Sequence, residues 1–406
     1  MGASLANMRK HKTDKVIALM VLFLALISLV IVYAIGGRVA QAENAATGKH
    51  YSDTYFFFHH IAVVFLAIVA MVVGNFVSYD FLKKNAKKMF WTAAALCLLV
   101  TIFGRLGLGL VTCDEGACRA FYVPVISIGF APVELLKVSV ALYGSYLVRS
   151  RKESGELETK AFWVPYATMF AVTVIFVGAF QKDFGSTVVI ATMMASMAFV
   201  GGVKLKQLAL AGLVLLLAAG ILIMTAEHRI NRIMGWEGSG DNYHMRSSLI
   251  SFGTGGLTGV GLGNSIQASG YLPESLTDSI FSIIGETWGF VGATLVIVIF
   301  SILLRRIIRV AERTEDQEKS LFAVSVFAWI ISHVIINIGG MLGIIPMKGI
   351  TLPFLSYGGT SMLFAAFAVG MVLQISGWTK RGKINESSSS RRGQRGARYA
   401  GSSRRS

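Results

Sequence analysis

The candidate chemistry of this chain begins with three carboxylates at the entrance to an apolar segment. Glu274, Asp278 and Glu286 lie within residues 271–286, where a long polar stretch passes into an apolar run. Excess negative charge in such a place is costly unless cations, a metal ion or a bound substrate offsets it. Ser275 and Asp278 also have the spacing of a capping box, so a helix-start role for Asp278 is the alternative.

Two further motifs place ionisable groups at membrane depth, where such groups are costly and tend to be functional. Glu134 and Lys137 are three residues apart, so on a helix they share one face and can form an ion pair, which is either structural or part of a site. Asp183 stands in a polar turn between two apolar segments. There it either contributes to a site or caps the following helix.

A turn near the end of the chain carries another candidate pair. Residues 346–361 contain two prolines and paired glycines, which predict a re-entrant turn bearing Lys348 and Ser356. The alternative is a plain surface turn with a solvated lysine.

The elements that must position these residues are membrane-spanning helices. Hydrophobic residues make up 54% of the 406 residues and charged residues only 15%, which excludes an ordinary soluble domain of this size. The apolar residues form blocks of about 20, the length that crosses a bilayer as a helix, and the short alternating segments of a β-barrel are absent. We predict an all-α integral membrane protein with about ten transmembrane helices. The predicted spans are residues 16–36, 57–78, 89–110, 132–149, 162–180, 184–202, 207–225, 280–304, 321–345 and 354–377.

The distribution of charge predicts the orientation. The net charge is +16, and Lys and Arg concentrate at both ends of the chain and on alternate loops. This is the positive-inside pattern, so we expect both termini in the cytoplasm and a first helix that is retained rather than cleaved as a signal peptide. The basic residues that mark the predicted inner loops are Lys83, Lys84, Lys87 and Lys88; Arg149, Arg151, Lys152 and Lys160; and Arg305, Arg306 and Arg309.

The predicted organisation is one membrane domain with short extensions. Residues 1–15 form a cytoplasmic N-terminal segment, residues 16–378 the polytopic domain, and residues 379–406 a disordered basic cytoplasmic tail rich in Ser, Gly and Arg. Residues 226–279 form a large extracytoplasmic loop between helices 7 and 8. Its apolar content indicates that part of it folds back on the membrane surface.

The three cysteines divide into two kinds. Cys97 lies within an apolar block and is assigned to packing. Cys113 and Cys118 lie on a predicted outer loop, where oxidation to a disulfide is one of two open outcomes. A metal site made of two cysteines alone is not expected.

Several polar motifs occur together and in order. From the N-terminus they are Pro132-x-Glu134-x-x-Lys137, Asp183-Phe-Gly185, Arg229-x-x-Arg232, Gly261-Leu-Gly-Asn-Ser-Ile-Gln267, Tyr271-Leu-Pro-Glu274, Thr277-Asp278, Gly285-Glu286 and Leu352-Pro-Phe-Leu-Ser356-Tyr-Gly-Gly-Thr-Ser361. This set resembles the signature of the SEDS family (shape, elongation, division and sporulation) of peptidoglycan glycosyltransferases, and the resemblance covers residues 16–378. The run Met347-Lys348-Gly-Ile-Thr-Leu-Pro353 resembles the division type of the family, its FtsW-like branch.

The resemblance implies a lipid II polymerase that builds septal glycan strands on the outer face of the cytoplasmic membrane and releases undecaprenyl pyrophosphate. The family's essential aspartate matches Asp278, which would accept the proton of the attacking sugar hydroxyl. No cofactor is established, although Mg²⁺ or Mn²⁺ would suit carboxylates and a diphosphate. The implied partners are a class B penicillin-binding protein transpeptidase (FtsI-like), other membrane proteins of the divisome and membrane lipids, with no nucleic acid. The candidate substrate-binding residues are Glu134, Lys137, Asp183, Arg229, Arg232, Arg246, Glu274, Glu286, Lys348 and Ser356, whose cations would neutralise the diphosphate.

Three alternative functions stay open. Polar residues within spans also suit a lipid II flippase, although carboxylates confined to one mouth favour chemistry at a surface over transport through the midplane. A rod-shape (RodA-like) elongation paralogue and an inactive scaffold that recruits a transpeptidase are the others. The departures from the family pattern that keep the scaffold open leave the aspartate in place, and they are His59-His60, Val133, Lys182, Ala268 and Leu276.

Overall fold

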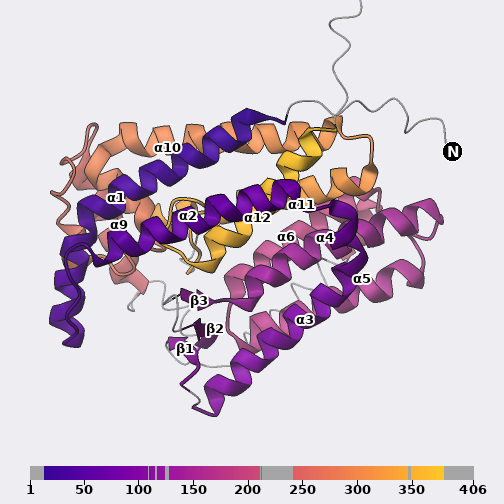
Figure 1. Ribbon diagram of the computed structural model, residues 1–406, viewed down its shortest axis with the longest axis horizontal. Helices are drawn as coiled ribbons and strands as arrows, with labels where there is room; N and C mark the ends of the chain where they lie inside the picture. Colours follow the sequence, from indigo (N-terminus) through magenta and orange to yellow (C-terminus); the bar gives the residue numbers. More distant parts are fainter. Residues whose placement is uncertain are drawn as a thin grey trace, which may run out of the picture.

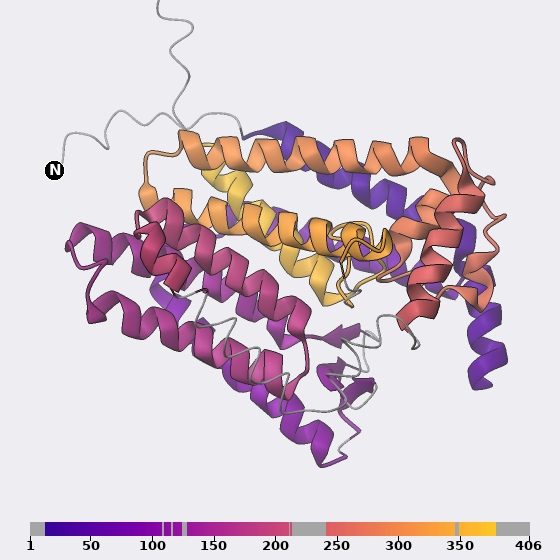
Figure 2. The ribbon, with the colours of Figure 1, turned by 180° about the vertical axis from the view of Figure 1, so that it is seen from behind.

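The protein is an elongated bundle of helices with a small sheet at one end (Figures 1 and 2). The computed structural model describes residues 13–107, 109–114, 117–123, 128–210, 212, 241–345 and 349–378. In chain order, the elements that position the site and the membrane core are α1 (Lys15–Thr47), α2 (Tyr55–Phe76), α3 (Tyr79–Arg105), β1 (Val111–Asp114), β2 (Ala117–Val123), β3 (Ile128–Phe130), α4 (Pro132–Glu153), α5 (Lys160–Thr173) with its π-helical continuation η2 (Val174–Phe180), α6 (Phe184–Gly201), α9 (Asp241–Gly255), η4 (Gln267–Tyr271), α10 (Ile280–Arg313), α11 (Gln317–Met341) and α12 (Thr360–Ser376).

The membrane-spanning character of these helices confirms the predicted fold class. Within the described ranges, seven helices are long and apolar enough to cross a bilayer: α1, α2, α3, α5 with η2, α6, α10 and α11. Helix α12 is apolar but shorter, and α4 carries more charge and lies inside the bundle against α3, α6 and α11. Nine of the ten predicted spans therefore coincide with helices, whereas the span predicted at 207–225 falls almost wholly outside the described residues.

Helices α2 and α12 cross at two glycines, one on each helix. A Cβ atom on Gly74 of α2 would lie 2.3 Å from the carbonyl oxygen of Phe367, and one on Gly370 of α12 would lie 2.1 Å from that of Met71. No side chain fits at these distances, so the two glycines let the backbones touch. In lipid, where apolar burial gives little net drive for helix association, such close backbone packing is a main source of attraction.

The basic residues predicted to mark inner loops lie on helices instead, which corrects the span boundaries. Helix α3 already begins at Tyr79, so the four lysines between residues 83 and 88 occupy its first turns. Helices α4 and α10 likewise continue through their basic residues to Glu153 and Arg313. A helix satisfies its own backbone hydrogen bonds in water as well as in lipid, so a change in residue polarity marks the hydrocarbon boundary and not the end of the helix.

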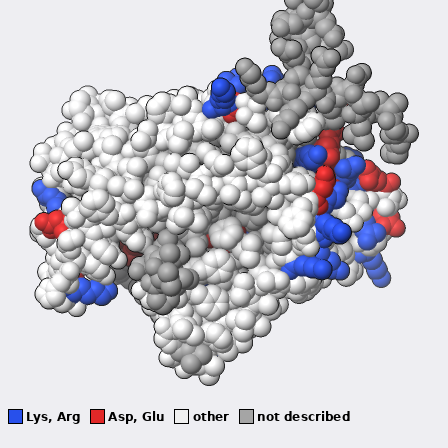
Figure 3. Space-filling view, viewed as in Figure 1, with Lys and Arg blue, Asp and Glu red and all other residues white. Residues whose placement is uncertain are grey.

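The two ends of the bundle differ in charge. At one end, which we call the charged end, ion pairs join neighbouring helices: Lys83 to Glu318 at 2.6 Å and Arg149 to Asp316 at 2.9 Å. Figure 3 shows charged side chains gathered at this end and a broad uncharged surface across the middle of the bundle. The start of α1 and the end of α12 also meet here, because the amide of Asp14 donates a 2.9 Å hydrogen bond to Ser376 Oγ.

The opposite end carries an antiparallel three-stranded sheet that the sequence analysis did not predict. The helix predicted to run to residue 110 ends at Arg105, and the chain then forms β1, β2 and β3 in that order across the sheet. Cys113 and Cys118 are opposite each other in the β1–β2 register and are joined as a disulfide, which decides the question left open. The disulfide packs on α3 at Gly104, where a Cβ would lie only 2.1 Å from Cys118 Sγ. Cys97, by contrast, is buried in α3 as predicted.

Candidate active site

The site begins at turn 273–279, which leads into α10. Thr277 Oγ1 donates a 2.6 Å hydrogen bond to Glu274 Oε2, and the amide of Ser279 donates to the carbonyl of Glu274. Helix α10 starts without a side-chain cap, so the alternative capping role for Asp278 is wrong. The Asp278 carboxyl group is half-buried and remains available to the segments that surround this turn.

Asn337 of α11 holds the backbone of this turn in place. Its Nδ2 donates hydrogen bonds of 2.7 Å to the carbonyl oxygens of both Asp278 and Ile350, and its side chain is buried. A second link runs from the amide of Tyr357 to the carbonyl of Leu276 at 2.8 Å. The turn that bears Asp278 is therefore tied to segment 349–359. Asn337 was not among the predicted site residues, although an amide inside an apolar span is a signal of polar function.

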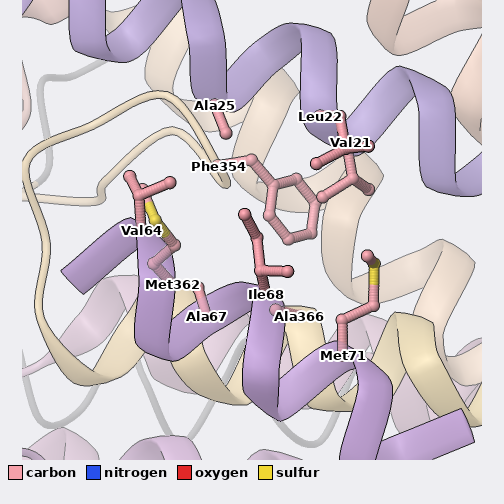
Figure 4. A pocket seen from close by; sticks show the side chains of 10 residues that line it. All are labelled: Val21, Leu22, Ala25, Val64, Ala67, Ile68, Met71, Phe354, Met362 and Ala366. Carbon is pink, nitrogen blue, oxygen red and sulfur yellow. The ribbon is translucent and has the colours of Figure 1, made fainter. Parts of the chain in front are cut away.

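Segment 349–359 is anchored in turn by its own side chains. Ser356 Oγ accepts a 2.7 Å hydrogen bond from the amide of Leu352, so the predicted candidate Ser356 closes the turn and is itself buried. Phe354 has φ of +63° and points its ring between α1 and α2, beside Val21 and Ile68 (Figure 4). This apolar anchor fixes the segment against the membrane core.

A cation from the sheet completes this side of the site. Arg119 of β2 donates hydrogen bonds from Nη2 to the carbonyl of Lys182 at 3.2 Å and from Nε to that of Gln181 at 3.4 Å. A Cβ atom on Gly349 would lie 3.1 Å from Asp278 Oδ2 and 4.0 Å from Arg119 Nη1. Gly349 thus leaves open the space between the carboxylate and the guanidinium. Arg119 was not among the predicted site residues, because nothing in its local sequence distinguishes it.

The electrostatics of this arrangement hold Asp278 near its titration point at neutral pH. The pKa of Asp278 is raised to about 7, and burial is the largest cause; repulsion from Glu274 and Asp183 also raises this pKa, whereas Arg119 lowers it. Asp183 also caps α6, since its Oδ1 accepts a 2.9 Å hydrogen bond from the amide of Ser186. Both roles weighed for Asp183 are therefore compatible. A carboxyl group with a pKa near 7 is well matched to general base catalysis at physiological pH.

Behind the site, the predicted pair Glu134–Lys137 belongs to a buried network. Lys137 Nζ lies 2.8 Å from Glu134 Oε1 and 3.3 Å from His333 Nε2, and Lys137 is fully buried. Trp329 Nε1 donates to the same Nε2 at 3.2 Å, while His333 Nδ1 lies 2.9 Å from the carbonyl of Thr351. Because Nε2 receives two donors, the imidazole is the neutral Nδ1–H tautomer and donates to Thr351. The network therefore supports segment 349–359 through the hydrogen bond from His333 to Thr351.

Comparison with known proteins decides the family. The model of the FtsW/RodA/SpoVE family, described as cell cycle proteins, matches residues 14–381. The chain belongs to this family. It is 32% identical to the probable peptidoglycan glycosyltransferase FtsW of Haemophilus influenzae over 370 residues, which covers 86% of this chain and 89% of that protein. It is 31% identical to stage V sporulation protein E of Bacillus subtilis, covering 92% and 99% of the two chains.

Solved structures agree on the fold. The rod shape determining protein RodA of Thermus thermophilus superposes with a TM-score of 0.64 at 20% identity, covering 90% of this chain and 96% of that one. A chain described in "Structural coordination of polymerization and crosslinking by a peptidoglycan synthase complex" superposes with a TM-score of 0.69, also at 20% identity, covering 90% and 97%. The multi-pass fold of the FtsW/RodA/SpoVE family is thus the fold of this chain.

In this family member, Glu286 holds a loop in place and does not face Asp278. Its Oε2 accepts a 2.5 Å hydrogen bond from Ser265 Oγ, and its Oε1 accepts from the amides of Ile266 at 3.0 Å and Gln267 at 3.3 Å. The side chain is buried on α10. A buried carboxylate with three donors has its charge satisfied by the protein itself.

We expect Glu286→Ala to loosen loop 260–271. Three donors would lose their acceptor, and each buried donor left without a partner costs about 1–3 kcal/mol. Hydrogen exchange measured by mass spectrometry should accelerate at Ile266, Gln267 and Ala268, with α3 peptides as the internal control. Unchanged protection of this loop would show that other contacts hold it.

The remaining predicted site residues are cations. Arg246 lies exposed on α9, whose neighbouring His244 is 2.6 Å from Ser279 Oγ, so that helix borders the Asp278 turn. Arg229, Arg232 and Lys348 lie outside the described residues. Within the ranges that are described, no group of three or more His, Cys, Asp or Glu side chains is arranged to hold a metal ion.

Proposed function

We propose that this protein is a lipid II polymerase that joins disaccharide units and releases undecaprenyl pyrophosphate. The observation that carries the proposal is the half-buried Asp278 carboxyl group, with a pKa of about 7, on a turn held by Asn337 and faced by Arg119. Membership of the family, and the peptidoglycan glycosyltransferase names of its relatives, support this chemistry over others that a poised carboxylate could perform.

In the proposed reaction, the Asp278 carboxylate accepts the proton of the acceptor sugar hydroxyl as that oxygen attacks the anomeric carbon of the donor. The bond from this carbon to the diphosphate oxygen breaks, and the diphosphate leaves as an anion, so no proton donor is needed. Negative charge on the leaving group requires cations. Arg119 is a cation that acts on the Asp278 carboxylate, and Arg246, Arg229, Arg232 and Lys348 are further candidates.

We also propose that the reaction occurs on the extracytoplasmic face of the cell membrane at the division septum, with both termini cytoplasmic. The start of α1 and the end of α12 meet at the charged end, and turn 273–279 lies at the other end of α10. An excess of Lys and Arg on one side is typical of the cytoplasmic face. Residues 1–15 and 379–406 would then be cytoplasmic and residues 226–279 largely extracytoplasmic.

A class B penicillin-binding protein is the partner that we propose for crosslinking. The structural neighbour from a peptidoglycan synthase complex, in which polymerization and crosslinking are coordinated, supports a transpeptidase beside this fold. Relatives named FtsW support the division role. Their sequence identity to this chain is about the same as that of the sporulation relative.

The decisive experiment reconstitutes the purified full-length protein in liposomes with lipid II, with and without the transpeptidase. We expect glycan polymer from the wild type and from Glu312→Gln, a change on the exposed far end of α10, and none from Asp278→Ala. Movement of lipid II across the bilayer without polymer would instead establish a flippase. No activity of either kind with the partner present would favour a scaffold.

A further inference from the structure

A polar cavity lies at the charged end, at the other end of α10 from Asp278. It has a volume of about 490 Å³ and is lined by Asp14 and Lys15 at the start of α1, by Arg306, Arg309 and Arg313 on α10, and by Ser376 at the end of α12. The separation along α10 is roughly 40 Å at 1.5 Å per residue. The cavity is therefore independent of the proposed polymerase site.

The lining of this cavity carries uncompensated positive charge. Arg306, Arg309 and Arg313 follow one another at spacings of three and four residues, so they share a face of α10. The carboxylate in the lining belongs to Asp14. Its Oδ2 lies 3.5 Å from Arg306 Nη1, and its Oδ1 caps α1 by accepting a hydrogen bond from the amide of Val16. In the part of the chain that the structure describes, neither Arg309 nor Arg313 forms an ion pair. An anionic ligand would satisfy them.

The position of the cavity indicates what the ligand is. Three apolar helices, α1, α10 and α12, have an end here, and the surface changes from uncharged to charged (Figure 3). This is the level at which phospholipid headgroups meet a membrane protein. The adjoining segments of the chain carry the wrong charge to fill it. Residues 1–12 hold three Lys or Arg and no acid, and residues 379–406 hold nine and one Glu.

We propose that this cavity binds the headgroup phosphate of an anionic phospholipid from the leaflet at the charged end. Arg309 and Arg313 would contact the phosphate, Lys15 would add charge at the rim, and the acyl chains would lie along the apolar surfaces of α1 and α10. Basic pockets between transmembrane helices bind anionic headgroups in this way. The site would seat the protein at a defined depth.

Native mass spectrometry of the full-length protein tests this site, with phosphatidylglycerol as the probe and phosphatidylcholine as the neutral comparison. The cavity variant is Arg309→Gln/Arg313→Gln. The matched control is Lys84→Gln/Arg305→Gln, which removes two charges at the same end from exposed positions outside the lining. At roughly fivefold per charge, we expect the cavity variant to bind phosphatidylglycerol about 25-fold more weakly and the control within about twofold of the wild type.

Several results would overturn the site: equal losses in both variants, no loss in either, equal binding of phosphatidylcholine, or complete displacement of the lipid by an equal concentration of inorganic phosphate. If the double variant does not fold, the single change Arg313→Gln at an exposed position takes its place, with an expected loss of about fivefold. Phosphatidylglycerol should also raise the melting temperature of the wild type and of the control but not that of the cavity variant.

Discussion

Asp278→Asn should reduce the rate of lipid II polymerisation by roughly 10²–10⁴-fold, the usual contribution of a positioned general base. The amide keeps the shape of the side chain but cannot accept the proton. Product formation by the purified, reconstituted protein measures the effect, with Glu312→Gln as the control that should retain full activity. At pH 8 the D278N protein should melt at least as high as the wild type, because it avoids the cost of a partly buried charge. A rate within tenfold of the wild type would exclude Asp278 as the base.

The pH dependence gives a sharper version of this test. The active form is the anion, so the rate should rise with pH up to the pKa of about 7 and level off above it. Arg119 lowers this pKa and Glu274 raises it. Arg119→Gln should therefore move the rising limb to higher pH, and Glu274→Gln should move it to lower pH. Shifts of both variants in the same direction would contradict the assignment, whatever their effect on the maximal rate.

The same pKa has a consequence for stability. An unfolded aspartate titrates near 3.8, well below the folded value of about 7. The folded state therefore binds the proton more tightly, and the stability that this proton contributes is lost as the pH rises through 7. Asp278→Asn should remove this component of the pH dependence, which melting temperatures measured between pH 5 and pH 9 will show.

Lys137→Met should strongly destabilise the described core. It would leave the buried Glu134 carboxylate without its cation, and breaking a buried ion pair from one side costs about 3–5 kcal/mol. It would also remove one of the two donors to His333 Nε2. The melting temperature of the solubilised protein measures the loss, and Lys88→Met, at an exposed position on α3, is the matched control.

The double variant Glu134→Gln/Lys137→Met separates a structural pair from a functional one. Without either charge, most of the lost stability should return, since a neutral buried pair has no uncompensated charge. Polymerisation should stay at least tenfold reduced, because His333 Nε2 would keep only the Trp329 donor, and the Thr351 that His333 holds lies two residues from Gly349 at the site. Recovery of activity together with stability would show that the pair is structural only.

Some features of the site follow from local sequence, because their signal is local. The ion pair Glu134–Lys137 forms at the predicted spacing on one face of α4, and Asp183 caps α6 as one of its two predicted roles. The cost of charge in an apolar segment made these residues conspicuous. Predictions from local patterns were wrong in two ways. Helix α3 includes the lysines that were predicted to lie in a loop, and the predicted loop around Cys113 and Cys118 forms paired strands.

The sequence by itself determined that the chain is a polytopic helical membrane protein and that Asp278 stands at the entrance to a span, because hydrophobic length and isolated charges are readable one segment at a time. Only the tertiary structure decided what surrounds that carboxylate. Arg119 reaches it from a strand 159 positions earlier in the chain and Asn337 from a helix 59 positions later, and Glu286, eight positions away, turns to another loop. A pKa depends on burial and on charges nearby in space, and no local pattern of residues records which distant segments meet.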